Sequence, residues 1–217
     1  MLYGISAKKQ SGKDLFLKIW NALILTKDGE PLLDEEILKL KTDILCRGAE
    51  YFGVGTFERE YFAKPLKEIC SIIFKCDISS FEDEAFKENE LPKTWMSNFP
   101  GIKTYREALQ YIGTNMFREM FHKNMWVICA LSTYEENKNW FVTDVRFPNE
   151  KEAIEKLGGK VIRIDTNKVS VDEHLSETSL DDAEFDIRII NDFDFGNYTR
   201  KIYDIMLSER IFETKIK

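Results

Sequence analysis

Apolar residues recur at two different spacings along this chain, and the two spacings predict a series of strands and helices. Residues 1–6 (MLYGIS) form a short apolar run that is typical of a buried strand. From Gly12 onward, apolar residues recur every three or four positions, as they do on one face of a helix. The same helical spacing continues over residues 34–51. The beginning of the chain therefore predicts a strand, a loop and two helices.

The middle of the chain is less regular. Residues 61–74 (YFAKPLKEICSIIF) predict a short extended piece that is broken at Pro65 and followed by a helix. Residues 77–103 mix acids, aromatic residues and two prolines with little periodicity, and we interpret them as a lid or insertion over the site rather than a linker between domains. Residues 104–121 then predict one long helix whose apolar stripe of methionine and aromatic side chains belongs to the core.

The last part of the chain alternates strand-like and helix-like segments. Strands are predicted in WFVTDVRF (140–147), KVIRID (160–165) and FDIRIIN (185–191), and helices in NEKEAIEKLG (149–158) and GNYTRKIYDIMLSER (196–210). Strands that alternate with helices are typical of a mostly parallel sheet covered by helices on both faces. The pattern predicts the α/β fold class.

Composition and charge narrow the class of protein. The 217 residues are 43% hydrophobic and 32% charged, which predicts one ordinary domain over residues 1–217. A net charge of -7 argues against a nucleic-acid partner. Four cysteines without C-x-x-C spacing and two histidines do not suggest zinc. No apolar run has the length of a signal sequence or a membrane span, so we expect a cytoplasmic protein with reduced thiols and no membrane partner.

The stretch GISAKKQSGKDLF (4–16) resembles a loop that binds phosphate. The usual frame G-x-x-x-x-G-K-[ST] between a strand and a helix here runs from Ala7 to Asp14. Gly12 allows the backbone to approach a phosphate closely, and the helix that begins there directs its free N–H groups at the anion. Lys13 adds a positive charge. Candidate ATP-binding residues are Lys9, Gln10, Ser11, Gly12, Lys13 and Asp14.

Two positions of this frame differ from the usual pattern. Ala7 replaces a glycine, which is tolerable where the backbone keeps a negative φ. Asp14 replaces the hydroxyl residue, and its carboxylate repels a polyphosphate unless a cation lies between them. Mg²⁺ prefers oxygen ligands, so Asp14 is a candidate magnesium ligand. In the alternative interpretation, Asp14 is only a favourable acid in the first turn of a helix.

The segment TDVRFPNE (143–150) places two charged residues where a predicted strand ends. Open α/β sheets bind ligands at the carboxyl ends of their strands, so Asp144 is a candidate for holding Mg²⁺ and Arg146 for holding phosphoryl oxygens. Glu150 is a further candidate for contact with a substrate. The alternatives are an Asp–Arg pair that closes a turn before Pro148, and a first-turn acid in the case of Glu150.

A third set of candidates follows one predicted helical face. Arg106 could bind a phosphate and Gln110 the edge of a base, while Gly113 would allow close approach. The same set includes Thr114, and Trp126 could stack on a base or form the wall of its pocket. Taken singly, Trp126 fits a core position better and Arg106 a surface position better.

Five blocks of the chain, taken in order, resemble the phage-type deoxynucleoside monophosphate kinases. They are SGKD (11–14), FAKPLKE (62–68), REALQYIGT (106–114) with Trp126 beyond it, TDVRFPNE (143–150) and HLSETSLD (174–181). The Asp after the loop lysine belongs to that family's pattern, whereas many relatives carry Gly at position 7. The resemblance implies a three-layer P-loop kinase fold with a helical insertion for the acceptor site or lid.

The resemblance also implies phosphoryl transfer from ATP, with Mg²⁺, to a deoxynucleoside monophosphate. It places Lys13, Asp14, Asp144 and Arg146 at the phosphates as catalytic residues, and it places Arg106, Gln110, Trp126 and Glu150 near the acceptor. Another small-molecule kinase, similar to animal phosphomevalonate kinase, and an ATP-sensing switch without kinase activity are the alternatives. A homodimer is a possible assembly. A phage origin would make the host cytoplasm its location, and the sequence leaves the accepted bases open.

Overall fold

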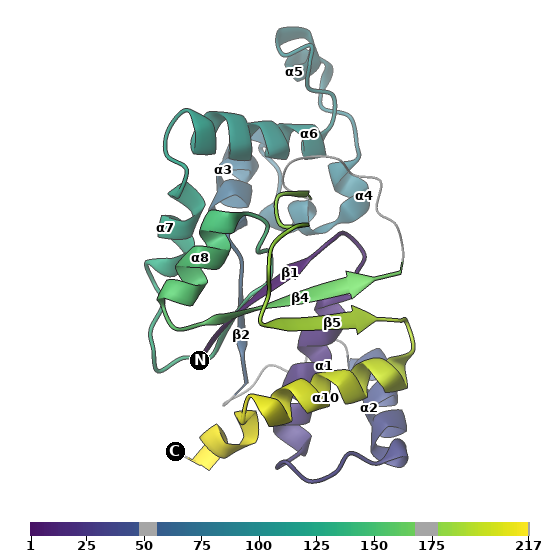
Figure 1. Cartoon of the computed structure of the whole chain (residues 1–217). Coiled ribbons are helices and arrows are strands. Elements are labelled where there is room, and N and C mark those ends of the chain that lie inside the picture. The colour runs from purple at the N-terminus through teal and green to yellow at the C-terminus, as the bar shows by residue number, and fades with distance from the viewer. Residues whose placement is uncertain (48–55, 168–177, 217) are drawn as a thin grey trace. The chain divides into compact units, whose positions relative to one another are not determined.

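The computed structural model describes residues 1–47, 56–167 and 178–216 of the chain (Figure 1). The chain divides into two compact units. The first unit comprises residues 1–60 and 135–217, and the second comprises residues 61–134. Residues 77–103, the predicted insertion, belong to the second unit, and their role as a lid stays a prediction.

The first unit is built on a parallel sheet with the strand order β2-β3-β1-β4-β5. Its strands are β1 (Leu2–Ala7), β2 (Glu58–Glu60), β3 (Trp140–Val142), β4 (Lys160–Thr166) and β5 (Ile187–Asn191). Strands β1 and β3 are almost wholly buried, as expected for a parallel sheet covered on both faces. The sheet confirms the predicted α/β class, and it is consistent with a P-loop kinase fold.

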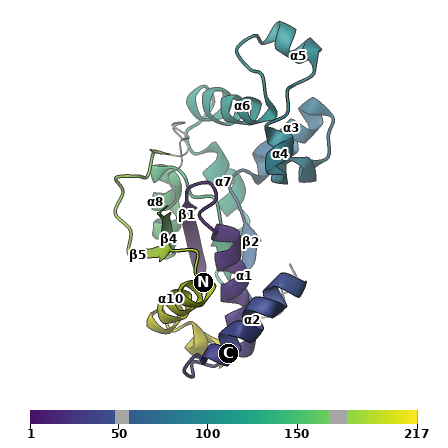
Figure 2. The same ribbon diagram turned by 90° about the vertical axis from the view of Figure 1, so that its right-hand side faces the viewer.

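Helices lie on both faces of this sheet. They are α1 (Lys13–Thr26), α2 (Asp34–Arg47), α8 (Pro148–Lys156) and α10 (Phe195–Ser208), with a final 3₁₀ helix, η3 (Ile211–Ile216). Side chains alternate along β1, so Tyr3 and Ile5 join the core formed with α1, whereas Gly4 faces Ile154 of α8. A Cβ atom built on Gly4 would lie 2.7 Å from Cδ1 of Ile154. Figure 2 shows α1 and α8 on opposite sides of β1.

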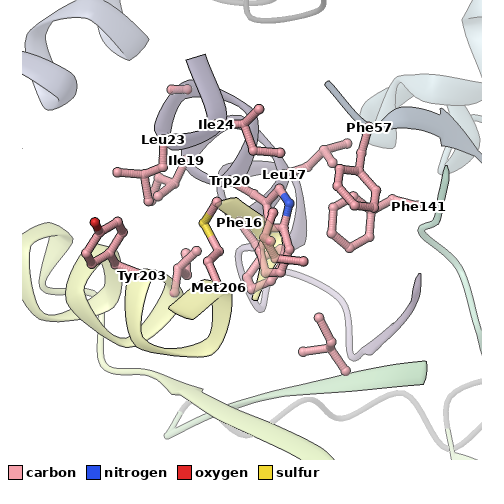
Figure 3. Packing of buried hydrophobic residues seen from close by; sticks show 14 of the residues in the cluster. Phe16, Leu17, Ile19, Trp20, Leu23, Ile24, Phe57, Phe141, Tyr203 and Met206 are labelled. Carbon is pink, nitrogen blue, oxygen red and sulfur yellow. The ribbon is translucent and has the colours of Figure 1, made fainter. Parts of the chain in front are cut away.

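The core of the first unit is rich in aromatic side chains. Trp20 of α1 packs edge-on against Phe141 of β3, with ring centroids 5.2 Å apart, and Phe57 lies 4.8 Å from Phe141 (Figure 3). Met206 and Tyr203 of α10 close the same cluster. Because these side chains come from segments far apart in the sequence, the core fixes β1 and α1 in place, and with them the loop that joins them.

The second unit is helical. It contains α3 (Lys64–Phe74), η1 (Ile78–Glu82), α4 (Glu84–Lys87), α5 (Lys93–Asn98), α6 (Tyr105–Gln110), η2 (Tyr111–Glu119) and α7 (Met125–Leu131). The predicted long helix is in fact α6 followed by a π-helical stretch, η2. Ala108 and Ile112 of its apolar stripe are buried, but Met116 and Met120 are exposed. The prediction that the whole stripe belongs to the core was therefore wrong.

Candidate active site

The predicted phosphate loop (residues 7–14) connects the end of β1 to the start of α1 in the first unit. Gly12 is the N-cap of α1 and has a φ of 85°, in the left-handed region that favours glycine. The hydroxyl and the backbone N–H of Ser11 both donate to the carbonyl of Lys8, the N–H at 3.2 Å. The chain thus turns tightly just before the start of α1, where the first N–H groups of the helix have no partner within the helix. Such free N–H groups at a helix start commonly bind anions.

Asn191, the last residue of β5, hydrogen-bonds to this loop and so helps to fix its conformation. Its side-chain amide donates to the carbonyl of Ser11 at 3.0 Å, and its oxygen accepts from the backbone N–H of Phe193 at 3.0 Å. A Cβ atom on Gly12 would lie only 2.3 Å from Nδ2 of Asn191. The sequence prediction did not include Asn191. Its only signal was an amide residue at the end of an otherwise apolar predicted strand.

Lys13 is the centre of a charged cluster. Burial lowers the pKa of its amine, the positive charge of Arg146 lowers it further, and Arg59 adds a smaller effect in the same direction. The carboxylates of Asp144 and Asp14 act in the opposite direction and favour the charged amine. The structure therefore brings together the four residues predicted to be catalytic, Lys13, Asp14, Asp144 and Arg146. Their roles stay predictions.

Asp14 has a partner that the sequence prediction missed. Its Oδ1 lies 3.0 Å from Nη1 of Arg59, the middle residue of β2. Nε of the same guanidinium donates to the hydroxyl of Thr143 at 3.3 Å, and Thr143 directly follows β3. Arg59 therefore contacts both the predicted phosphate loop and the end of a neighbouring strand. An arginine in the short, charged segment ERE gave no sequence signal for this position.

The carboxylates of Asp14 and Asp144 suit the magnesium ion that the sequence predicts. Both are near enough to Lys13 to raise the pKa of its amine. Mg²⁺ in nucleotide sites commonly takes one or two carboxylates and completes its shell with phosphate oxygens and water. The described residues contain no cluster of three or more acidic, histidine or cysteine side chains that could hold a metal by itself. The donor set fits a metal shared between protein and nucleotide.

Glu150 has a structural position at the start of α8. It is 1% exposed, and its Oε2 accepts the backbone N–H of Arg146 at 2.7 Å and that of Phe147 at 3.0 Å. These bonds satisfy N–H groups at the beginning of the helix and fix the backbone that carries Arg146. The geometry therefore makes Glu150 a residue that positions Arg146, and its predicted contact with a substrate remains a prediction.

A small pocket lies beside the predicted phosphate loop. Its lining includes Ala7 and Lys8 of the loop, Arg146, and Arg163 of β4. The buried guanidinium of Arg163 donates to the hydroxyl of Ser6 at 3.0 Å and pairs with Asp165 at 3.0 Å and with Asp181 at 3.2 Å.

Asp181 also pairs with Lys8 at 2.7 Å, so it connects the loop to β4. Asp181 ends the HLSETSLD block, whose residues 174–177 lie outside the described part of the chain. The sequence prediction gave no role to Arg163. Its signal was a charged residue in the middle of an apolar predicted strand.

The remaining candidates lie in the second unit. Arg106 of α6 is held by two carboxylates of the α4 region: its Nη2 lies 2.6 Å from Glu84, and its Nε lies 2.6 Å from Glu88. These contacts fix a guanidinium that stays partly accessible to solvent. Glu84 also pairs with Lys87, which lies three residues further along the chain, and burial lowers the pKa of this lysine.

Trp126 is a core residue of the second unit. It is 2% exposed, its Nε1 donates to the carbonyl of Gly113 at 2.9 Å, and its ring lies 5.0 Å from that of Phe117. A Cβ atom on Gly113 would lie 2.7 Å from Leu66, so Gly113 is needed for packing against α3. Gln110 ends α6 and Thr114 lies on η2. The structure thus brings Gly113 and Trp126 into direct contact, with Gln110 and Thr114 on the same run of helix.

The first unit defines the class of protein. Its parallel sheet has a central strand that leads through a glycine turn into a helix, and Lys13 lies there with Asp14, Asp144 and Arg146. This is an α/β fold that is consistent with a P-loop kinase. The comparison with known families names it more closely. The chain belongs to the deoxynucleotide monophosphate kinase family, whose sequence model matches residues 42–202.

A viral relative supports this assignment. A protein of Acanthamoeba polyphaga mimivirus, provisionally named a deoxynucleotide monophosphate kinase, is 31% identical over 150 residues, which cover 62% of this chain and 75% of the relative. The family match begins after the predicted phosphate loop, so the interpretation of the loop rests on its geometry. Within the described parts of the chain, no helix has the length and apolar character needed to cross a membrane.

Proposed function

We propose that this protein transfers the terminal phosphoryl group of ATP to a deoxynucleoside 5'-monophosphate, giving ADP and the deoxynucleoside diphosphate. One observation carries the proposal. In a chain of the deoxynucleotide monophosphate kinase family, the turn at Gly12 leads into a helix whose first residue, Lys13, is surrounded by Asp14, Asp144 and Arg146. These are the charges that phosphoryl transfer requires, since this reaction depends on positioning and charge stabilisation.

The donor side of the proposed reaction lies in the first unit. The N–H groups at the start of α1 and the amine of Lys13 would bind the phosphates of ATP, with Lys9, Gln10 and Ser11 along the loop. Asp14 and Asp144 would hold Mg²⁺, which when bound offsets the charge of the phosphate oxygens. The lowered pKa of the Lys13 amine has burial as its main cause, and an anion beside the amine would favour its charged form.

The acceptor side draws on the second unit. A phosphate oxygen of the monophosphate attacks the terminal phosphorus of ATP, and the bond from that phosphorus to the bridging oxygen of ADP breaks. Arg106, whose guanidinium is fixed by Glu84 and Glu88, would bind the acceptor phosphate.

The other acceptor candidates have smaller proposed roles. Gln110 and Thr114 would contact the nucleoside, and the buried Trp126 would support the pocket wall through Gly113. Residues 77–103 would act as the lid that excludes water.

On the phosphate side, Arg146 would spread the charge that develops during transfer, with its backbone fixed by Glu150. The proposal thus gives Arg146 a catalytic role and Glu150 a positioning role.

A coupled assay of ADP release tests the proposal. The purified protein is given ATP and Mg²⁺ with each of the four common deoxynucleoside monophosphates, with phosphomevalonate, and with no acceptor. ADP release that requires at least one of the monophosphates is the expected result. Release with phosphomevalonate alone would indicate a different small-molecule kinase, and ATP binding without release for any acceptor would indicate a nucleotide-dependent switch.

A further inference from the structure

Arg59 occupies a position that the proposed mechanism does not use. Strands β2 and β3 run parallel, with Arg59 opposite Phe141 and Glu60 opposite Val142, so both strands end at the same edge of the sheet as β1. At that edge Arg59 pairs with Asp14 at 3.0 Å and donates to Thr143 at 3.3 Å. Two contacts from one planar guanidinium fix its position beside the predicted phosphate loop.

The partner of Arg59 is the residue at which this loop departs from the usual frame. A Ser or Thr at position 14 would be neutral, whereas Asp14 places a full negative charge one residue after Lys13. Like charges a few ångströms apart repel, so an unbalanced Asp14 would weaken the binding of phosphate groups. The side chain of Asp14 is 61% exposed, so its carboxylate is open to solvent and to a cation, while Arg59 contacts it from β2.

We infer that Arg59 is a positioning residue: it balances the charge of Asp14 when no metal is bound, and it holds that carboxylate ready to be a magnesium ligand. The inference rests on the proposed function, because it assumes that the loop binds the phosphates of a nucleotide. In this arrangement, the guanidinium and Mg²⁺ compete for one carboxylate. Arg59 therefore sets how strongly nucleotide binding depends on magnesium, and it does so only through Asp14.

Calorimetry of ADP binding tests this without any turnover. The dissociation constant of ADP is measured with excess EDTA and with saturating Mg²⁺, and the ratio of the two constants is the magnesium dependence. Arg59→Ala should raise this ratio about fivefold, mainly by weakening binding in EDTA, since a partly exposed ion pair is worth up to about 1 kcal/mol. Asp14→Asn should lower the ratio. Arg59→Lys, which keeps the charge, should stay close to the wild type.

A double variant separates positioning from direct contact with phosphate. If Arg59 acts through Asp14, then Arg59→Ala added to Asp14→Asn should leave the ratio unchanged. The matched control is Arg188→Ala, which removes another partly exposed strand arginine that pairs with an aspartate, Asp165, at 2.8 Å. Thermal unfolding of each variant shows whether it is folded, and Arg59→Gln, which also removes the charge, replaces Arg59→Ala if the latter is not.

The outcomes distinguish this inference from the proposed function. An unchanged ratio in Arg59→Ala would overturn the inference while leaving the proposed function intact. Equal weakening with and without Mg²⁺, also present in the Asp14→Asn background, would overturn it too, because Arg59 would then bind phosphate directly. Failure of the wild-type protein to bind ADP under either condition would instead remove the proposed function on which the inference rests.

Discussion

At the scale of single residues, the charge of Lys13 depends on a balance. Burial and Arg146 lower the pKa of its amine, while Asp144 and Asp14 raise it. An anion between the amine and Arg146 would relieve their mutual repulsion and would favour the protonated form. The same arrangement that makes Lys13 costly to charge in the free protein therefore favours binding of a phosphate.

Replacing Lys13 tests its predicted catalytic role. We expect Lys13→Ala to lower turnover at least about a hundredfold, a loss of about 3 kcal/mol of charge stabilisation in the transition state. Turnover is measured by ADP release, and thermal unfolding reports on the fold. Near-normal turnover in a folded Lys13→Ala protein would contradict the assignment of the loop.

The lowered pKa of the Lys13 amine also predicts a pH dependence. The protonated amine binds phosphate, so below its pKa in the free protein no proton has to be taken up on binding. As pH rises through that lowered pKa, binding must be accompanied by proton uptake, and the affinity for ADP should fall. Calorimetry from neutral to alkaline pH, in buffers of different ionisation enthalpy, measures both quantities. Lys13→Met should remove the proton uptake, and its persistence in that variant would assign it to another group.

Sequence reasoning at this scale found the residues that are near in the chain or at strand ends. Asp14 stood out because it breaks a known frame, and Asp144 and Arg146 because they follow a buried strand. Asn191 and Arg59 were missed because their roles depend on partners that the fold supplies: Asn191 lies 180 positions from Ser11, to which it donates. No local pattern encodes such a pairing.

At the scale of elements, the geometry of the predicted phosphate loop depends on a single glycine. Gly12 combines a φ of 85° with a contact distance to Asn191 that leaves no room for a side chain. Gly158 offers a comparison, because it has a similar φ of 76° but no atom within 4 Å of an added Cβ. An alanine at position 158 would therefore cause backbone strain alone, whereas an alanine at position 12 would cause both backbone strain and steric overlap.

We expect Gly158→Ala to destabilise the protein by about 1 kcal/mol, the cost of a left-handed conformation alone. Gly12→Ala should cost at least about 2 kcal/mol, because the new methyl group also displaces the Asn191 amide. Denaturant unfolding of both variants gives the free energies. Equal losses would mean that Asn191 moves aside at no cost.

Most predicted elements of the first unit agree with the structure, because buried parallel strands and amphipathic helices have distinct periods. The strand predicted in residues 140–147 is shorter, covering only Trp140–Val142, and the three-residue strand β2 was not predicted. Residues 111–119 were different. Their apolar spacing fits an ordinary helix, yet they form a π-helical stretch, and two methionines of the supposed core stripe are exposed. A π-helix depends on one extra residue per turn that tertiary packing accommodates, here beside Gly113, Leu66 and Trp126, and the apolar period does not reveal it.

At the scale of the whole molecule, the proposed donor residues belong to the first unit and most of the proposed acceptor residues to the second. Each set is fixed by contacts inside its own unit. Lys13 and Asp14 depend on the sheet edge, and Arg106 depends on Glu84 and Glu88. Binding of the two substrates should therefore be separable by mutation.

Arg106→Ala should weaken the binding of the accepted deoxynucleoside monophosphate about tenfold and leave the affinity for ADP nearly unchanged, since a charge-assisted bidentate contact is lost from one site only. Calorimetry with each nucleotide measures both affinities. Lys103→Ala, which removes an exposed positive charge from the same unit, is the control. Lost affinity for ADP with intact binding of the monophosphate would mean that the two sites have been assigned the wrong way round.

The order of the strands also affects when the chain becomes able to bind a nucleotide. Strand β1 is made before its neighbours β3 and β4, which follow more than a hundred residues later, and Asn191 is made later still. Contacts between such distant segments form slowly. A nascent chain that ends before β5 would contain the whole glycine loop but lack the amide that holds it. Affinity for ADP should therefore emerge only after β5 has been made, which makes ligand binding a late marker of folding rather than an aid to its first steps.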